Sequence, residues 1–205
     1  MSDQSMVTQP VLNREAELDL LEGHVREALR LASKSGADQA EVSAHAHQGL
    51  SVQARLGEVE TLERMQDRGL SITVFLGKRK GYATCADQRT QTIADCVRYA
   101  IEIARYTQDD TANGLADPSE MATEFPDLDL WHPVAMDASA AIDRALACEA
   151  AGRSNEKVTN SEGASFEAGL GLGIYGNSNG FIGRSAGTRY SQSCVLLAGV
   201  GDGMQ

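Results

Sequence analysis

The stretch from Ala40 to Asp87 alternates apolar and polar residues, which is typical of strands with one buried face. Three runs follow one another, over residues 42–54, around residues 59–62 and over residues 70–76, and a short further run begins at Tyr82. We expect glycines to form the joints between these runs: Gly49, Gly57, Gly69, Gly77 and Gly81. The pattern predicts an antiparallel β-meander with tight turns.

Three other segments repeat apolar residues at steps of three and four, and each repeat predicts an amphipathic helix. The segments lie at about 14–34, 90–106 and 138–151. Asn13 is a suitable N-cap for the first helix, and Gly36 is a suitable stop. The first helix therefore precedes the meander, and the second follows it.

After the third helix the strand pattern returns, with a hairpin signal, Asn-Ser-Asn-Gly, at 177–180. The expected strands lie at about 158–161, 165–175, 181–188 and 190–199. Together the elements predict an α+β fold in which antiparallel β-meanders form a sheet and three helices pack on it. The two halves, each a helix followed by a meander, indicate a duplication by topology alone.

The domain organisation follows from the same pattern. Residues 1–12 are expected to form a disordered arm, and residues 13–205 one α+β domain. Within it, residues 107–136 form an acidic crossover loop that is rich in Asp and Glu and holds most of the prolines. One interpretation is a solvated crossover pinned by Leu128, Leu130 and Trp131; the other is a strap that binds a partner.

Charge and composition exclude several classes of protein. The formal net charge is −11, which disfavours a nucleic-acid partner, because Lys and Arg supply most of the affinity for phosphate. The N-terminus lacks the pattern of a signal peptide, and no apolar run approaches the ~20 residues of a membrane span. The cysteines lie far apart in the sequence without a C-x-x-C pair, as in reduced cytoplasmic proteins: Cys85, Cys96, Cys148 and Cys194.

Two short motifs match known sites without their context. The sequence GLGIYG at 171–176 matches a dinucleotide-binding loop, but a turn and a strand are expected after it instead of a helix. Bends in a glycine-rich strand explain it better. The sequence SNEK at 154–157 matches the S-x-x-K of penicillin-binding enzymes, whose S-D-N and K-T-G elements do not occur here.

Metal and anion sites are equally unsupported. His45 and His47 share one face of an expected strand, but a catalytic zinc needs three protein ligands. His24 lies on the first expected helix and His132 lies in a loop. The basic triplet at 78–80 reads as a charged hairpin tip. We therefore expect no catalytic, cofactor-binding or metal-binding residues in this chain.

Several blocks nevertheless resemble one family in order and spacing. They are GEVETLE at 57–63, DRGLSITVF at 67–75, LDLWHP at 128–133, VTNSEGAS at 158–165 and GNSNGF at 176–181. These blocks resemble the N-terminal domain of the PmbA/TldD family, and their variants are more similar to the PmbA side, also called TldE.

The resemblance implies a role in a cytoplasmic two-subunit metallopeptidase that degrades unfolded or small peptides and trims leader peptides. It implies that a TldD-type partner carries zinc or a similar divalent metal on a His-Glu-x-x-x-His motif, and that the PmbA-type subunit is non-catalytic. It also implies a β-rich C-terminal domain that residues 1–205 do not include. The alternative is a regulatory interaction module of the kind named modulator of DNA gyrase, without a peptidase role.

Overall fold

A computed structural model describes residues 12–87, 89–134 and 137–199 of the chain. Three α-helices, one short 3₁₀ helix and five strands are found there. In chain order they are α1 (Arg14–Lys34), β1 (Gln39–Arg55), β2 (Glu58–Leu76), β3 (Arg79–Cys85), α2 (Thr90–Tyr106), η1 (Pro118–Glu120), α3 (Ala138–Arg153), β4 (Val158–Asn177) and β5 (Ile182–Ala198). The predicted α+β class and all three helices are confirmed.

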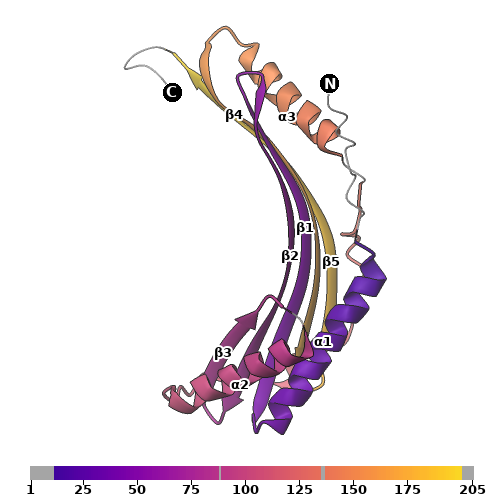
Figure 1. Cartoon of the computed structure of the whole chain (residues 1–205), viewed down its shortest axis with the longest axis vertical. Coiled ribbons are helices and arrows are strands. Elements are labelled where there is room, and N and C mark those ends of the chain that lie inside the picture. The colour runs from indigo at the N-terminus through magenta and orange to yellow at the C-terminus, as the bar shows by residue number, and fades with distance from the viewer. Residues whose placement is uncertain (1–11, 88, 135–136, 200–205) are drawn as a thin grey trace.

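The five strands form one antiparallel sheet in the order β3-β2-β1-β4-β5. Four of them are 17 to 20 residues long. Figure 1 shows that these long strands bend together into a crescent, with α1 and α3 on its convex side. The two expected meanders are thus halves of a single sheet, joined where β1 pairs with β4.

All three helices cover the same face of this sheet, in two groups. At one end α1 and α2 pack over alternate residues of β1 such as Val42, and over Ile72 of β2. At the other end α3 packs its alanines over Val52 and Phe166. The even-numbered residues of β1 are buried from Ala40 to Ala54, as alternation on a strand requires.

The predicted joints are only partly correct. Gly57 and Gly77 lie in the hairpin turns with positive φ, as expected. Gly49 and Gly69 lie inside β1 and β2 instead, so the second and third expected runs are one strand. In the same way, the four strands expected after α3 are the two continuous strands β4 and β5.

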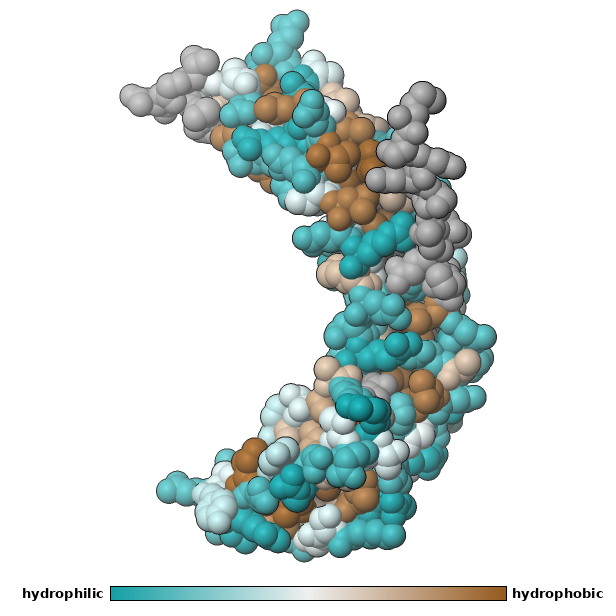
Figure 2. All heavy atoms as spheres, in the orientation of Figure 1, coloured by the Kyte–Doolittle hydropathy of each residue, from teal (hydrophilic) through white to brown (hydrophobic). Residues whose placement is uncertain are grey.

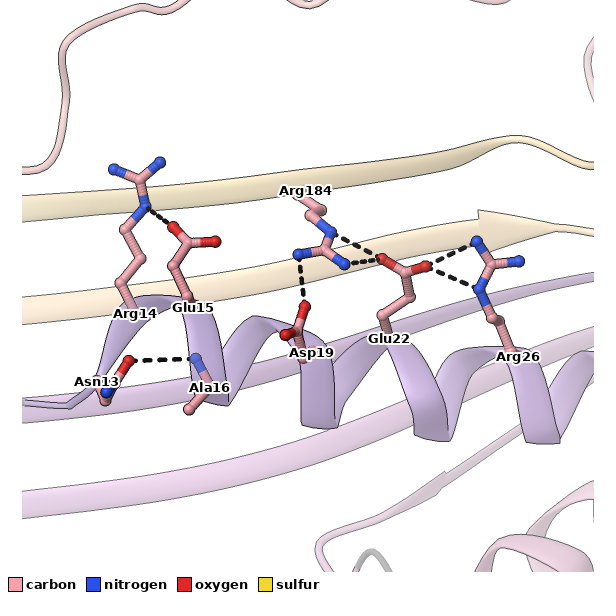
Figure 3. Close-up of polar contacts among 8 residues, drawn as sticks. All are labelled: Asn13, Arg14, Glu15, Ala16, Asp19, Glu22, Arg26 and Arg184. Carbon is pink, nitrogen blue, oxygen red and sulfur yellow. Dashed lines mark hydrogen bonds and ion pairs between the residues drawn. The ribbon is translucent and has the colours of Figure 1, made fainter.

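Arginines from two strands fix helix α1 to the sheet, and Figure 3 shows the contacts of one of them, Arg184. Arg184 of β5 contacts Asp19 and Glu22, with 2.9 Å from its Nη1 to Asp19 Oδ1. From β2, Arg68 makes a two-pronged contact with Glu17, which the figure does not draw. The side chain of Asn13 caps the helix by accepting the N–H of Ala16, as predicted.

Helix α2 approaches β3 so closely that one position must be glycine. A Cβ on Gly81 would lie 1.9 Å from the backbone oxygen of Ala100 and 2.7 Å from the backbone nitrogen of Ala104. Both atoms belong to the helix backbone, which cannot turn aside as a side chain can. Gly81 is therefore a packing residue inside β3. The prediction that Gly81 forms a turn is wrong.

The acidic crossover follows the outer edge of β5. The N–H of Thr188 donates to Leu130 O at 2.9 Å, and the N–H of Val134 donates to the Tyr190 hydroxyl at 2.9 Å. Trp131 packs against the larger core, as predicted. The expected anchoring by the Leu128 and Leu130 side chains is wrong, because both are largely exposed; Leu130 holds the crossover through its carbonyl.

Two expectations concern other parts of the chain. The disordered arm predicted at 1–12 falls almost wholly outside the described residues and stays a prediction. Within the described ranges, none of the helices has the length and apolar character needed to cross a bilayer.

Candidate functional site

The concave face of the sheet is the candidate site, because the helices of the described chain leave it uncovered (Figure 1). Odd-numbered residues of β1, from Ser43 to Gln53, point to this face. Figure 2 shows the same hollow in a space-filling view, with hydrophilic residues along much of the rim that borders it. The site is therefore a broad, polar surface.

Two histidines at the middle of this face have glycines beside them, His45 on both sides and His47 on one side. The register places His45 between Gly69 of β2 and Gly173 of β4. His47 lies between Asp67 of β2 and Gly171 of β4. A Cβ on Gly69 would lie only 2.4 Å from Cε1 of His45, so the imidazole ring occupies the space over that glycine.

His45 also contacts Asp67, with 3.1 Å between Nε2 and Oδ2. Their side chains are 54% and 66% exposed, so the pair contributes at most about 1 kcal/mol to stability. His45 and His47 share one face of β1, as predicted, and this face is the concave one. Nowhere in the described residues do three or more His, Cys, Asp or Glu side chains group so as to hold a metal ion.

An aromatic pocket of about 390 Å³ opens toward one end of the concave face. Tyr175 and Phe125 line it, and Phe181 packs against both rings, with centroids 5.8 and 5.7 Å away. The Tyr175 hydroxyl donates to Glu41 Oε2 at 2.9 Å. Burial, together with this hydrogen bond, raises the pKa of Tyr175.

Sequence reasoning missed this pocket. Phe125 belongs to the acidic crossover, and Tyr175 lies inside the GLGIYG motif, so no local pattern connects them. Long-range pairing brings them together, since the crossover returns beside the β4–β5 turn. The pocket can accept an apolar side chain of a ligand that lies along the face.

The other candidate motifs occupy structural positions. The GLGIYG motif lies inside β4 and is followed by a turn, as expected for a glycine-rich strand. Ser154 is the C-cap of α3, and its hydroxyl donates to Ala151 O at 2.7 Å. The basic triplet lies at the β2–β3 turn, where Lys78 Nζ donates to Asn113 O and Arg79 donates to Arg105 O.

The two remaining histidines lie away from the concave cluster. His24 is half-buried on α1, with its Nδ1 buried and without a hydrogen-bond partner. His132 belongs to the crossover, where Nε2 lies 2.7 Å from Asp129 O. The structure therefore joins His45 and His47 with Asp67, and it separates His24 and His132 from them.

These features define an α+β domain whose long curved sheet presents a glycine-lined concave surface. The chain belongs to the PmbA/TldD family. Residues 40–104 match the PmbA/TldA metallopeptidase domain 1, and residues 131–205 match the PmbA/TldA metallopeptidase central domain. Both matched ranges contribute strands to the same sheet.

Two curated relatives support this membership. A metalloprotease PmbA homolog of Haemophilus influenzae is 40% identical over 202 residues, covering 96% of this chain and 45% of the relative. Metalloprotease PmbA of Escherichia coli O157:H7 is 42% identical over 190 residues, covering 92% and 42%. The chain thus spans less than half the length of these relatives.

Solved structures share the fold. A protein named as a modulator of DNA gyrase, from Bacteroides thetaiotaomicron, has a TM-score of 0.81 at 25% identity, covering 90% of this chain and 42% of its own. TldE from Thermococcus kodakarensis has a TM-score of 0.71 at 14% identity, covering 88% and 40%. The curved sheet is therefore common to proteins with distant sequences.

Proposed function

We propose that the chain is the N-terminal part of a PmbA/TldE-type, non-catalytic subunit of a cytoplasmic TldD/TldE metallopeptidase complex. Family membership carries the proposal, and the likeness to a TldE structure supports it. The described residues offer no three-ligand group, and a catalytic zinc requires one. In this proposal zinc or a similar divalent metal is held by a TldD-like partner, and the present chain supplies scaffold.

The concave face is proposed as part of the chamber in which peptides are held. Gly171 leaves open space on this face beside His47, and the pocket beside Tyr175 accepts an apolar side chain. Such a surface suits extended, unfolded peptides of varied sequence, including leader peptides. The polar rim is compatible with a chamber filled with water (Figure 2).

Co-purification tests the complex. A full-length protein carrying this chain is expected to associate with a His-Glu-x-x-x-His subunit, and peptidase activity is expected to follow the complex. The chain alone, loaded with zinc, is expected to hydrolyse no peptide, with or without His45→Ala and His47→Ala. Activity of the chain alone, lost in those variants, would overturn the proposal, as would failure to associate with any such subunit.

A glycine-filling variant tests the chamber separately. A Cβ on Gly171 meets only His47 Cδ2, at 4.0 Å, and no backbone atom. Gly171→Val therefore adds bulk to the concave surface of β4, and valine suits a strand. Peptide hydrolysis by the complex is expected to fall several-fold while the subunits stay associated. Gly23→Ala, on the exposed side of α1, is the matched control. Unchanged hydrolysis in the Gly171→Val complex would show that the concave face does not hold the peptide.

A regulatory interaction module is the second candidate function, because a structural relative is named as a modulator of DNA gyrase. The net charge of −11 favours a protein partner over DNA in that case. A supercoiling assay with purified gyrase distinguishes the two. An effect of the chain on gyrase without any TldD-like subunit would favour the module.

A further inference from the structure

One edge of the sheet is open over part of its length. Strand β3 pairs with β2 only at residues 70–76, and Figure 1 shows β3 beside that end of β2 alone. Over residues 58–65, β1 is the one strand of the described chain that pairs with β2. Every residue of this stretch is exposed. We call residues 58–65 the open edge.

The register shows which backbone groups the open edge presents. Ala40 of β1 exchanges hydrogen bonds with Ser178, on the side of β4. Because the hydrogen-bonding direction alternates along a strand, the odd-numbered residues of β1 bind β2, and they pair there with odd-numbered residues. The first register shift occurs only beyond Gln53. Leu62 and Arg64 therefore direct their N–H and C=O groups away from β1, toward the open edge.

The other edges of the sheet are covered or short. Along β5, the N–H of Thr188 donates to Leu130 O of the crossover. Strand β3 is 7 residues long and presents the exposed Lys80. Covering segments, short strands and lysines are the usual means of blocking an edge, because an unpaired edge templates the addition of another strand. The open edge of β2 has no lysine, and no segment of the described chain covers it.

Charge favours a basic ligand at the open edge. Its charged residues are Glu58, Glu60, Glu63 and Arg64. Glu60 lies 3.8 Å from Arg55, whereas Glu58 and Glu63 have no ion-pair partner among the described residues. The chain as a whole has a formal net charge of −11, so two copies repel one another at such an edge, whereas a segment with Lys or Arg is attracted.

The side chains of the open edge alternate between the two faces of the sheet. Glu63 and Met65 pair with odd-numbered residues of β1, so they lie on the concave face. Leu62 pairs with Val52, so it lies on the opposite face, where it is 41% exposed. A strand added here would meet a carboxylate on the concave face and an apolar side chain on the other.

We propose that the open edge of β2 binds an extended peptide, which adds to the sheet as a further strand. The peptide backbone bonds to Leu62 and Arg64, a Lys or Arg side chain lies beside Glu63, and an apolar side chain lies beside Leu62. The proposal locates the peptide of the proposed chamber, and in that respect it rests on the proposed function. Its tests measure binding to the chain alone, so they do not depend on a peptidase.

Fluorescence anisotropy with labelled peptides tests binding. The probe is a short peptide of alternating lysine and valine. One control replaces lysine by glutamate, and a second carries an N-methyl group on every amide, which prevents strand addition. The probe is expected to bind about tenfold more tightly than either control, which corresponds to the loss of one or two hydrogen bonds or a charge contact. Equal affinity of the methylated peptide would refute strand addition, and equal affinity of the glutamate peptide would refute the preference for basic peptides.

Arg64→Pro tests the backbone of the open edge. Proline removes an outward N–H that makes no bond to β1, and such positions of edge strands tolerate it. Arg64→Ala removes the same positive charge and keeps the N–H. The lysine peptide is expected to bind Arg64→Pro about tenfold more weakly than Arg64→Ala. Equal affinity in the two variants would overturn the backbone contact.

Glu63→Gln tests the charge contact. Affinity for the lysine peptide is expected to fall several-fold at low salt, and the difference from the unmutated chain is expected to shrink at high salt. Glu124→Gln, an exposed glutamate of the crossover, is the matched control. An equal loss in both variants would show that the peptide is attracted to the acidic surface in general, against the proposed site.

Amide hydrogen exchange on the unmutated chain locates the peptide without relying on variants. Binding is expected to slow exchange at Leu62 and Arg64, with little change in the central strand β1. Slowed exchange only at β3 or β5 would place the peptide elsewhere and overturn the proposal. Sedimentation without peptide is expected to show no association through this edge. A dimer that protects the same amides would assign the open edge to a second copy instead.

Discussion

The buried carboxylate of Glu149 on α3 accepts the backbone N–H of Gly57 at 2.9 Å. Its other oxygen accepts the N–H of Leu56 at 2.7 Å and the hydroxyl of Ser161 at 2.5 Å. Leu56 and Gly57 both have positive φ and form the β1–β2 turn. One side chain thus satisfies the donors of a strained turn and fixes the hairpin tip to α3 and β4.

Replacing Glu149 by Gln is expected to destabilise the fold by about 2 kcal/mol. The amide keeps the shape of the side chain, but its NH₂ group faces a backbone N–H that needs an acceptor. Urea unfolding, compared with Asp143→Asn on the exposed side of the same helix, measures the difference. A loss below about 0.5 kcal/mol would show that water or a rearranged turn replaces the carboxylate.

The same carboxylate is expected to make stability depend on pH. Burial raises the pKa of Glu149, but the hydrogen bonds from Ser161, Gly57 and Leu56, with nearby Arg153, outweigh it and hold the pKa below the ordinary 4.5. A lowered folded-state pKa stabilises the protein above the unfolded value and loses that effect as pH falls through the folded one. The urea midpoints of the unmutated protein and Glu149→Gln should therefore converge as the pH is lowered from neutral to about 3. A difference between the two urea midpoints that stays constant with pH would show that Glu149 is not ionised in the folded protein.

Replacing Gly81 or Gly23 by alanine is expected to change the stability of the protein in opposite directions. Gly81→Ala places a methyl group against the backbone of α2 at Ala100, and it should cost about 3 kcal/mol. Gly23→Ala meets nothing within 4 Å and should stabilise α1 by about 0.5–1 kcal/mol. Thermal or urea unfolding of both variants checks the contrast. Similar stability for the two would mean that α2 is not seated on β3.

The arginine contacts on α1 are expected to contribute modestly. Arg184→Ala removes the contacts with Asp19 and Glu22 and should cost about 1 kcal/mol, since the guanidinium is 40% exposed and partly screened. The loss should shrink in 1 M salt, where the Debye length is about 3 Å. Arg189→Ala, an exposed arginine on the same strand, is the control. A loss independent of salt would indicate packing and not charge.

Local rules predicted the helices well. Apolar steps of three and four, with Asn13 as the cap, give α1 the bounds found in the structure, and the same steps locate α2. The strands were divided too often because Gly49 and Gly69 resemble joints. They instead face the concave side, where histidine rings lie over the sheet and a larger residue would clash. A glycine on a curved strand and a glycine in a turn have the same local sequence signal.

Contacts between distant residues were beyond such rules. Gly152 and Leu196 are far apart in the sequence, and nothing local shows that α3 packs on β5 where these two residues meet. The aromatic pocket likewise depends on the path of the crossover past the β4–β5 turn, which puts Phe125 beside Phe181. The family resemblance and the local pattern predicted the α+β class. The concave face and its aromatic pocket depend on the pairing of distant strands, which no local pattern shows.

The great length of the strands also divides the apolar interior. The cluster under α1 and α2 and the cluster under α3 are separate, although both rest on β1 and β4. Between them β1 buries the polar Gln48, which accepts the N–H of Leu12. The smaller cluster can therefore open while the larger one persists. We therefore expect two cooperative folding units on common strands, whose stabilities a ligand lying along the whole concave face would couple.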